Sequence, residues 1–273
     1  MRNITPPVRN DVADYRTALA GRPIESRTLL VGYEDAIRAA YLSYEGDTIN
    51  ILALQSMALL DPAHAALLRE NYSALSKGRA LEELAADIYE AAEFRCPMCN
   101  FEQAATLDHF LGKGTYPEFS ILARNLVAAC NTCNNKKGAR PSNGFVHAYF
   151  DQLPNQQALV AKTVWEPELH VSYSLAEGHG LELNLFERLF SQFQILRLED
   201  RFAREGGYVL AEIMSSCAEP YGRGGSALVT AELSRQAGLC ERVYGINHYK
   251  TALLRALAGD DHFCDGGFSS ENG

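Results

Sequence analysis

The sequence lacks several features that would assign it to a specialised class. No run among the 273 residues approaches the roughly 18 uninterrupted apolar residues of a membrane-spanning helix, and the first residues lack the apolar segment of a secretory signal. We see no internal repeat. The Gly-rich stretch Tyr221–Ser226 is not followed by Gly-Lys-Ser/Thr, so it is expected to be a loop and not a phosphate cradle. We therefore expect no membrane association and a cytoplasmic location.

Positive charge is also scarce. The chain has 25 Lys and Arg residues against 34 Asp and Glu residues, a formal charge of −9, which argues against a protein that coats nucleic acid non-specifically. The segment Arg95–Arg140 differs, because it contains six basic and three acidic residues. It carries +3, which leaves −12 for the rest of the chain.

Hydrophobic patterning predicts an α+β fold that is mostly helical. A hydrophobic content of 47% is enough for a core. Two strands are expected within Leu159–Ser174, where β-branched and aromatic residues flank a Glu-Pro break. Three- and four-residue apolar spacing predicts helices over Tyr33–Tyr44, Ala63–Leu75, Leu81–Ala92, Leu183–Ile195, Leu196–Cys217, Ala227–Ala237 and Asn247–Leu257. We expect a helical N-terminal region (1–92), a central module (93–145) and a C-terminal α/β accessory region (146–273).

Four of the seven cysteines have the spacing of metal ligands. They form two Cys-x-x-Cys pairs separated by 30 residues, and they are Cys96, Cys99, Cys130 and Cys133. Two such pairs can supply the four thiolates of a structural Zn²⁺ site, and the long insert requires something sizeable to fold between them. The other three, Cys217, Cys240 and Cys264, lack ligand spacing and are interpreted as buried or free thiols.

The insert and the second cysteine pair carry a recognisable series of motifs. Asp108-His109 comes first, followed by YPEFS, by Asn125 in NLV, and by C-x-x-C-N-x-x-K-G with Asn134 directly after the last cysteine. In this order the motifs resemble the HNH, or ββα-metal, endonuclease family, in its branch with four zinc cysteines. The resemblance covers the central module, which it implies is a β-hairpin followed by a helix.

The resemblance implies a role for each matching residue. Asp108 and Asn134 would bind one catalytic Mg²⁺ or Mn²⁺, and His109, at the end of the first strand, would be the general base. Asn125 would hold the loop between the strands by side-chain to backbone hydrogen bonds. These residue types suit phosphodiester hydrolysis, which needs a base active near neutral pH and a hard cation with oxygen ligands.

The basic residues of the module are candidates for phosphate contacts, which position nucleic acid without reading its sequence. They are Lys113, Lys136, Lys137 and Arg140. For the lysine pair, a solvated helix face is an equal alternative. His147 lies in an apolar and aromatic setting that favours a packing role.

The sequence thus predicts a metal-dependent HNH endonuclease that hydrolyses DNA. Two alternatives stay open: a non-catalytic zinc module that binds nucleic acid or a protein, and an RNA-cleaving enzyme of the same fold. The region after the module more weakly resembles bacterial HNH proteins of anti-phage defence and retron-type systems. That resemblance, with the acidic flanks, suggests a nuclease that stays silent until a partner such as an ATPase delivers it to DNA.

Overall fold

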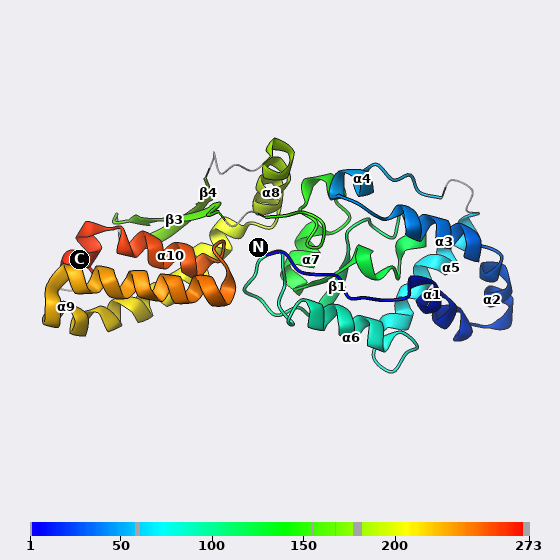
Figure 1. Cartoon of the computed structure of the whole chain (residues 1–273), viewed down its shortest axis with the longest axis horizontal. Coiled ribbons are helices and arrows are strands. Elements are labelled where there is room, and N and C mark those ends of the chain that lie inside the picture. The colour runs from blue at the N-terminus through cyan, green and yellow to red at the C-terminus, as the bar shows by residue number, and fades with distance from the viewer. Residues whose placement is uncertain (1, 58–60, 154–155, 167, 177–181, 270–273) are drawn as a thin grey trace. The chain divides into compact units, whose positions relative to one another are not determined.

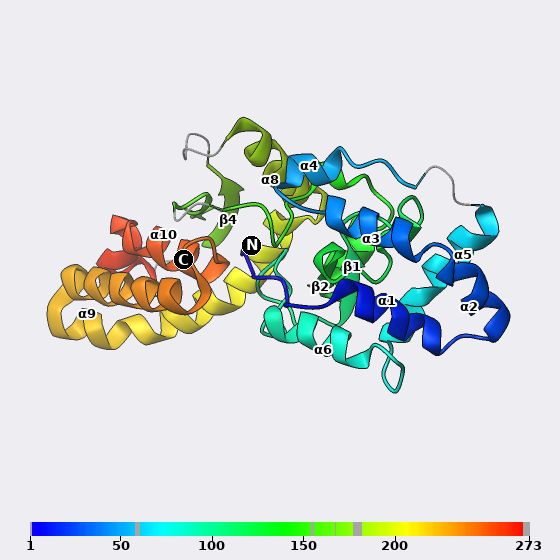
Figure 2. The ribbon, with the colours of Figure 1, turned by 45° about the vertical axis from the view of Figure 1, so that its right-hand side comes forward.

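The computed structural model describes residues 2–57, 61–153, 156–166, 168–176 and 182–269. The chain divides into two compact units (Figures 1 and 2). The first, here the site unit, contains residues 3–152 with 187–192. The second, here the C-terminal unit, contains Arg2, residues 153–186 and residues from 193 onward. The expected division into three sequence regions stays a prediction.

Short helices make up the first part of the site unit. The side chains of Asn10, Asp47 and Asp61 each accept a hydrogen bond from the first turn of a helix, which stabilises the helix start. The three helices predicted in this part of the chain are confirmed, and the one that begins after Asp61 passes into a 3₁₀ turn. The elements are α1 (Asp11–Ala20), α2 (Ile24–Val31), α3 (Glu34–Ser43), α4 (Thr48–Leu52), α5 (Pro62–Glu70), η1 (Asn71–Leu75) and α6 (Glu82–Ala91).

Buried aromatic residues connect these helices to the rest of the site unit. The Tyr15 hydroxyl donates a 2.9 Å hydrogen bond to the Leu30 carbonyl, which joins α1 to α2. Tyr44, directly after α3, is fully buried and packs edge-on against Phe119 at 5.0 Å between ring centroids. The helical layer is therefore packed against the loop in which the HNH-like motifs lie.

A β-hairpin followed by a helix forms the centre of the site unit. Strand β1 (Thr106–His109) pairs with β2 (Leu126–Ala129) in antiparallel register, with His109 opposite Leu126. Short 3₁₀ turns η2 (Pro117–Phe119) and η3 (Ala123–Asn125) order the connection. Helix α7 (Asn131–Lys137) starts directly after β2, and the turn η4 (Ser142–Gly144) follows it. The order is strand, loop, strand, helix.

The C-terminal unit has its own small sheet and core. The two predicted strands are confirmed as β3 (Leu159–Val164) and β4 (His170–Leu175), which pair antiparallel. Tyr173 of β4 packs on Phe202, which in turn stacks on Tyr249 with ring centroids 5.9 Å apart. The helical elements of this part of the chain are α8 (Leu183–Ile195), α9 (Leu198–Tyr244), α10 (Tyr249–Ala258) and the π-turn η5 (Phe263–Gly267). The mostly helical α+β class is confirmed for the described residues.

The Gly-rich stretch corrects one expectation. The predicted loop Tyr221–Ser226 is largely helical, and only Gly224 and Gly225 have non-helical backbone angles. Gly225 has φ +63°, which glycine adopts without the steric cost that a side chain would add. The chain reverses direction at this point, so that α9 is a helical hairpin (Figures 1 and 2). Two residues are enough for the turn.

Among the described residues, we find no helix with both the length and the apolar content needed to cross a membrane.

Candidate metal centre and active site

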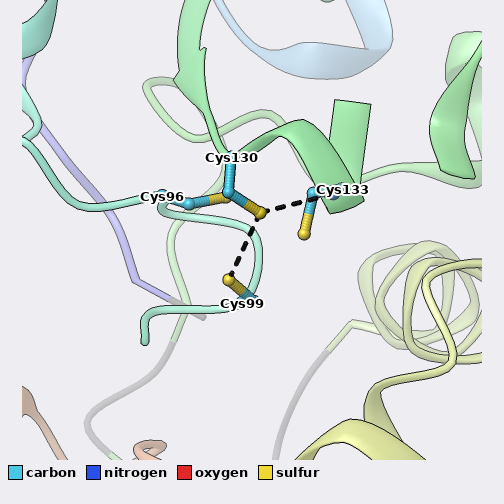
Figure 3. A group of neighbouring side chains, drawn as sticks. All are labelled: Cys96, Cys99, Cys130 and Cys133. Carbon is cyan, nitrogen blue, oxygen red and sulfur yellow. Dashed lines mark hydrogen bonds between the residues drawn. The ribbon is translucent and has the colours of Figure 1, made fainter. Parts of the chain in front are cut away.

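The four predicted zinc cysteines come together in the site unit. Cys96 and Cys99 lie in the loop after α6, and Cys130 and Cys133 lie at the start of α7, with all four side chains pointing toward one another (Figure 3). Their sulfur atoms lie within 4.8 Å of one another, and the Cys99 and Cys130 sulfurs are 3.9 Å apart. All four residues are buried. The predicted clustering is confirmed.

This geometry fits a tetrahedral zinc ion. A Zn–S bond of about 2.3 Å implies sulfurs about 3.8 Å apart, close to the separation seen here. Zn²⁺ binds cysteine sulfur readily as the thiolate, and its positive charge compensates the negative charge that four buried thiolates bring together. The four cysteines therefore suit a closed structural metal site.

The local backbone explains why both pairs can converge. After Cys96 the chain makes a tight turn, in which the Asn100 amide donates to the Cys96 carbonyl at 2.7 Å and Asn100 adopts φ +62°. Asparagine tolerates this left-handed conformation better than most residues. At the second pair, the Cys133 amide donates to the Cys130 sulfur at 3.3 Å, so that Cys130 caps α7. The long insert between the pairs contains the hairpin.

Asp108 faces α7 and binds a lysine. The Lys137 ammonium lies 3.0 Å and 2.8 Å from the two carboxylate oxygens of Asp108, and it donates to the His109 carbonyl at 2.5 Å. Both side chains are buried, with exposed fractions of 4% for Lys137 and 8% for Asp108. Burial raises the pKa of Asp108, and the lysine charge acts in the opposite direction. Three oxygen atoms thus surround one cationic position.

The placement of Lys137 differs from both readings of the sequence. We expected either a phosphate contact or a solvated helix face, yet this side chain is buried against the hairpin. The reason is its spacing from Asn134. Residues three apart share a helix face, and that face of α7 covers β1, where Asn134 donates to the Thr106 hydroxyl at 3.0 Å. The Lys137 ammonium is therefore held by Asp108 and does not face solvent.

Asp108 and Asn134 lie on the two sides of the contact between β1 and α7. Thr106 and Asp108 are two residues apart in β1, so their side chains share one face of the hairpin. Asn134 contacts Thr106, and Lys137, one helical turn later, contacts Asp108. The two expected metal ligands thus lie on the facing sides of β1 and α7, with lysine at the carboxylate.

His109 faces away from α7. Its Nε2 lies 2.9 Å from the Ser120 carbonyl, and its ring centroid is 4.8 Å from that of Tyr72. A carbonyl oxygen only accepts hydrogen bonds, so Nε2 carries the proton and Nδ1 keeps a lone pair that can accept one. Burial lowers the pKa of His109 to about 4. The imidazole is therefore neutral at neutral pH, the form that a general base requires.

Asn125 forms the loop contacts that the sequence predicts. Its side-chain oxygen accepts from the Leu111 amide at 2.7 Å, and its side-chain nitrogen donates to the Leu111 and Phe119 carbonyls at 3.0 and 3.1 Å. The same oxygen accepts from the Tyr44 hydroxyl, which also lies 3.2 Å from Nε2 of His147. Asn125 therefore bonds both ends of the loop between the strands, and His147 packs among aromatic side chains.

The remaining basic residues have separate environments. The Lys113 ammonium lies 4.0 Å from the centroid of the Tyr72 ring. Arg140 donates to the carbonyls of Lys136 and Lys137 and so caps the end of α7. Lys136 is half-buried. Contacts from Lys113, Lys136 and Arg140 to phosphate stay predictions.

The sequence interpretation missed two tyrosines that support these positions. Tyr72 donates to the Leu107 carbonyl at 2.8 Å and covers His109, and Tyr44 bonds Asn125. Both lie in the helical region, and no motif there singles them out. The isolated thiols behave as expected, since Cys217 and Cys264 are buried and Cys240 is half-buried, all without a disulfide.

The comparisons with known proteins do not show a family. No protein-family model matches the sequence, and no solved structure matches it. The chain is similar to "Protein ea31" of Escherichia phage lambda, with 27% identity over 137 residues. The match covers 47% of this chain and 46% of that protein, so the chain spans less than half of this relative's length. That name states no activity.

Proposed function

We propose that this protein is a metal-dependent endonuclease of the HNH type that hydrolyses DNA. One observation carries the proposal. A strand–loop–strand–helix unit with four clustered cysteines has Asp108 on the face of β1 that α7 covers, Asn134 on the face of α7 that contacts β1, and His109 at the end of β1.

The donor atoms suit a hard cation. Two carboxylate oxygens and the His109 carbonyl oxygen converge on the Lys137 ammonium, which shows that this position attracts positive charge. Mg²⁺ or Mn²⁺ held by Asp108 and Asn134 would supply a Lewis acid that stabilises charge on the leaving oxygen. Lys137 must withdraw from Asp108 to make room for such an ion.

His109 supplies the proton acceptor in this proposal. Its Nδ1 takes a proton from the attacking water, while the Ser120 carbonyl keeps the ring in the required orientation and tautomer. A pKa of about 4 makes a weak base. A bound phosphate diester brings negative charge next to the ring, which raises that pKa toward the range in which histidine is most effective.

The test is cleavage of supercoiled plasmid with Mg²⁺ or Mn²⁺ by the wild type, by His109→Ala and by a control, His170→Ala, whose histidine is exposed on β4. We expect cleavage by the wild type and the control only. Zinc content and thermal unfolding are measured on all three proteins, so that misfolding is recognised.

Two outcomes would favour other functions. Cleavage of an RNA substrate alone would assign the site to RNA. If the wild type and His109→Ala both bind zinc and nucleic acid and neither cleaves it, the protein is a binding module and the nuclease proposal fails.

A further inference from the structure

A large cavity lies in the helical part of the site unit, apart from the cysteines and from α7. Its volume is about 970 Å³. It is lined by the end of α1, the connection between α1 and α2, the end of α5, η1 and the following loop, together with Lys113 from the hairpin connection. All of these elements belong to the same compact unit.

The lining of this cavity is basic. It contains Arg22, Arg69, Arg79 and Lys113 but a single acid, Glu70. Arg22 is already engaged, because its guanidinium lies 3.3 Å from Glu70 and donates to Asn71 at 2.7 Å. No ion pair among the described residues involves Arg69 or Arg79. In a chain of net charge −9, three cationic side chains without an acidic partner face one hollow.

The cavity and the proposed base share one neighbour, Tyr72. Tyr72 lines it and also packs on the His109 ring, and the Lys113 ammonium lies over the same tyrosine. A ligand in the cavity would therefore be separated from His109 by one aromatic side chain. Anion-binding groups next to a phosphodiester-cleaving base are suited to the phosphates that flank the cleaved bond.

We propose that this cavity binds a single-stranded segment of nucleic acid through its phosphates, with Arg69 and Arg79 as the principal contacts. The choice of ligand rests on the proposed nuclease function. The cavity has the volume of a cube about 10 Å on edge, less than the roughly 12 Å width of the major groove of a DNA duplex, which favours a single strand over a duplex as the occupant. Arginine suits the task because its planar guanidinium can donate two hydrogen bonds to one phosphate.

The experiment measures binding without cleavage. Full-length zinc-loaded protein is titrated into a labelled single-stranded oligonucleotide, as DNA and as RNA, without added divalent cation and over a range of salt concentrations. The test variant is R69Q/R79Q. The matched control is R27Q/R38Q, which removes the same charge from exposed positions of α2 and α3 that do not line the cavity.

For single strands, each phosphate contact contributes about 0.7 to the slope of log K against log salt concentration, so losing two lowers the slope by about 1.4. If the proteins bind equally at 1 M salt, this corresponds to about 25-fold weaker binding at 0.1 M. We expect this loss for R69Q/R79Q, with DNA, RNA or both, and a wild-type slope for R27Q/R38Q.

The proposal is overturned if R69Q/R79Q keeps the affinity and slope of the wild type, or if the control loses as much. The same titration is run with a DNA duplex, and the proposal is also overturned if the loss appears with the duplex but not with a single strand. Because no bond is cut in this assay, its failure leaves the His109 cleavage test unaffected. If the protein cleaves no substrate but shows the expected slope change, the nuclease proposal fails and the proposed binding site stands.

Discussion

Replacing Lys137 with methionine removes the ammonium from the oxygen-lined position beside β1 and keeps most of the apolar length of the side chain. Asp108 then loses its partner, although it stays nearly inaccessible to water. Removing one member of a buried ion pair leaves an uncompensated charge, which is strongly destabilising. We therefore expect K137M to be less stable than the wild type.

The magnitude follows from the choices open to Asp108. Breaking a buried pair costs about 3–5 kcal/mol. The carboxyl can instead take up a proton, which at pH 7 costs about 4 kcal/mol, since it titrates near 3.9 when unfolded and each pH unit is about 1.4 kcal/mol. At pH 5 the same protonation costs about 1.5 kcal/mol. Because the variant raises the folded pKa of Asp108, its deficit should shrink as the pH falls from 7 to 5.

A divalent cation should offset the loss. If Asp108 and Asn134 hold Mg²⁺, the ion can enter freely once Lys137 is absent, and at 100 times its Kd it adds about 2.7 kcal/mol. The assay is urea unfolding of zinc-loaded wild type and K137M, each with and without Mg²⁺. Lys136→Met is the control, because it removes the neighbouring, half-buried charge.

Two results would refute this reasoning. If K137M lost no more stability than K136M, the ion pair would not compensate the charge of Asp108. If Mg²⁺ stabilised the wild type and K137M equally, the position that Lys137 fills would not be the one that binds a divalent ion.

Two further predictions concern the scaffold of the site. Cys133→Ser should lose bound zinc and the cooperative unfolding of the site unit, since structural zinc in small peptides contributes on the order of 10–16 kcal/mol. Asn134→Ala should keep the zinc. Metal analysis that found the same zinc loss in both variants would contradict the separation of structural and catalytic ligands. His147→Gln should make the free energy of unfolding less sensitive to acid. Burial lowers the pKa of His147 to about 3, so below about pH 6.5 the unfolded chain takes up a proton at this residue and the folded chain does not. The folded wild type therefore loses stability as the pH falls. The stability difference between wild type and variant should change by about 2 kcal/mol from pH 6.5 to pH 5 in denaturant titrations, and an unchanged difference would show that His147 does not titrate as described.

The parts of the site that sequence reasoning predicts are local. Two Cys-x-x-Cys turns can bring thiolates together through their own backbone geometry, and the sulfurs do cluster. Asn125 reaches backbone groups of the loop that precedes it, and these bonds also depend on short-range geometry. Capping residues such as Asp61 mark helix starts for the same reason.

The parts that it missed depend on packing between distant segments. The burial of Lys137 requires knowing that α7 lies on β1, and the role of Tyr72 requires knowing that η1 lies beside His109. Neither follows from spacing along the chain. The Gly-rich stretch was misjudged for a different reason, because glycine lowers helix propensity but does not prevent helix when packing supports it.

The position of Asp108 and His109 at the end of β1 limits where a phosphate could be cut. Successive side chains of a strand point to opposite faces, and here Asp108 contacts α7 whereas His109 contacts Ser120 and Tyr72. The pairing ends at His109, so beyond it the sheet no longer separates the two faces. The connection that follows borders two cavities: its Lys113 lines the large basic one, and its neighbours line another of about 420 Å³ that also includes Lys137. In the proposed enzyme, a phosphate has to contact both an ion on Asp108 and the base His109, so it has to approach this connection. We therefore expect the loop after β1 to position the substrate, and neither face of the strand to do so alone.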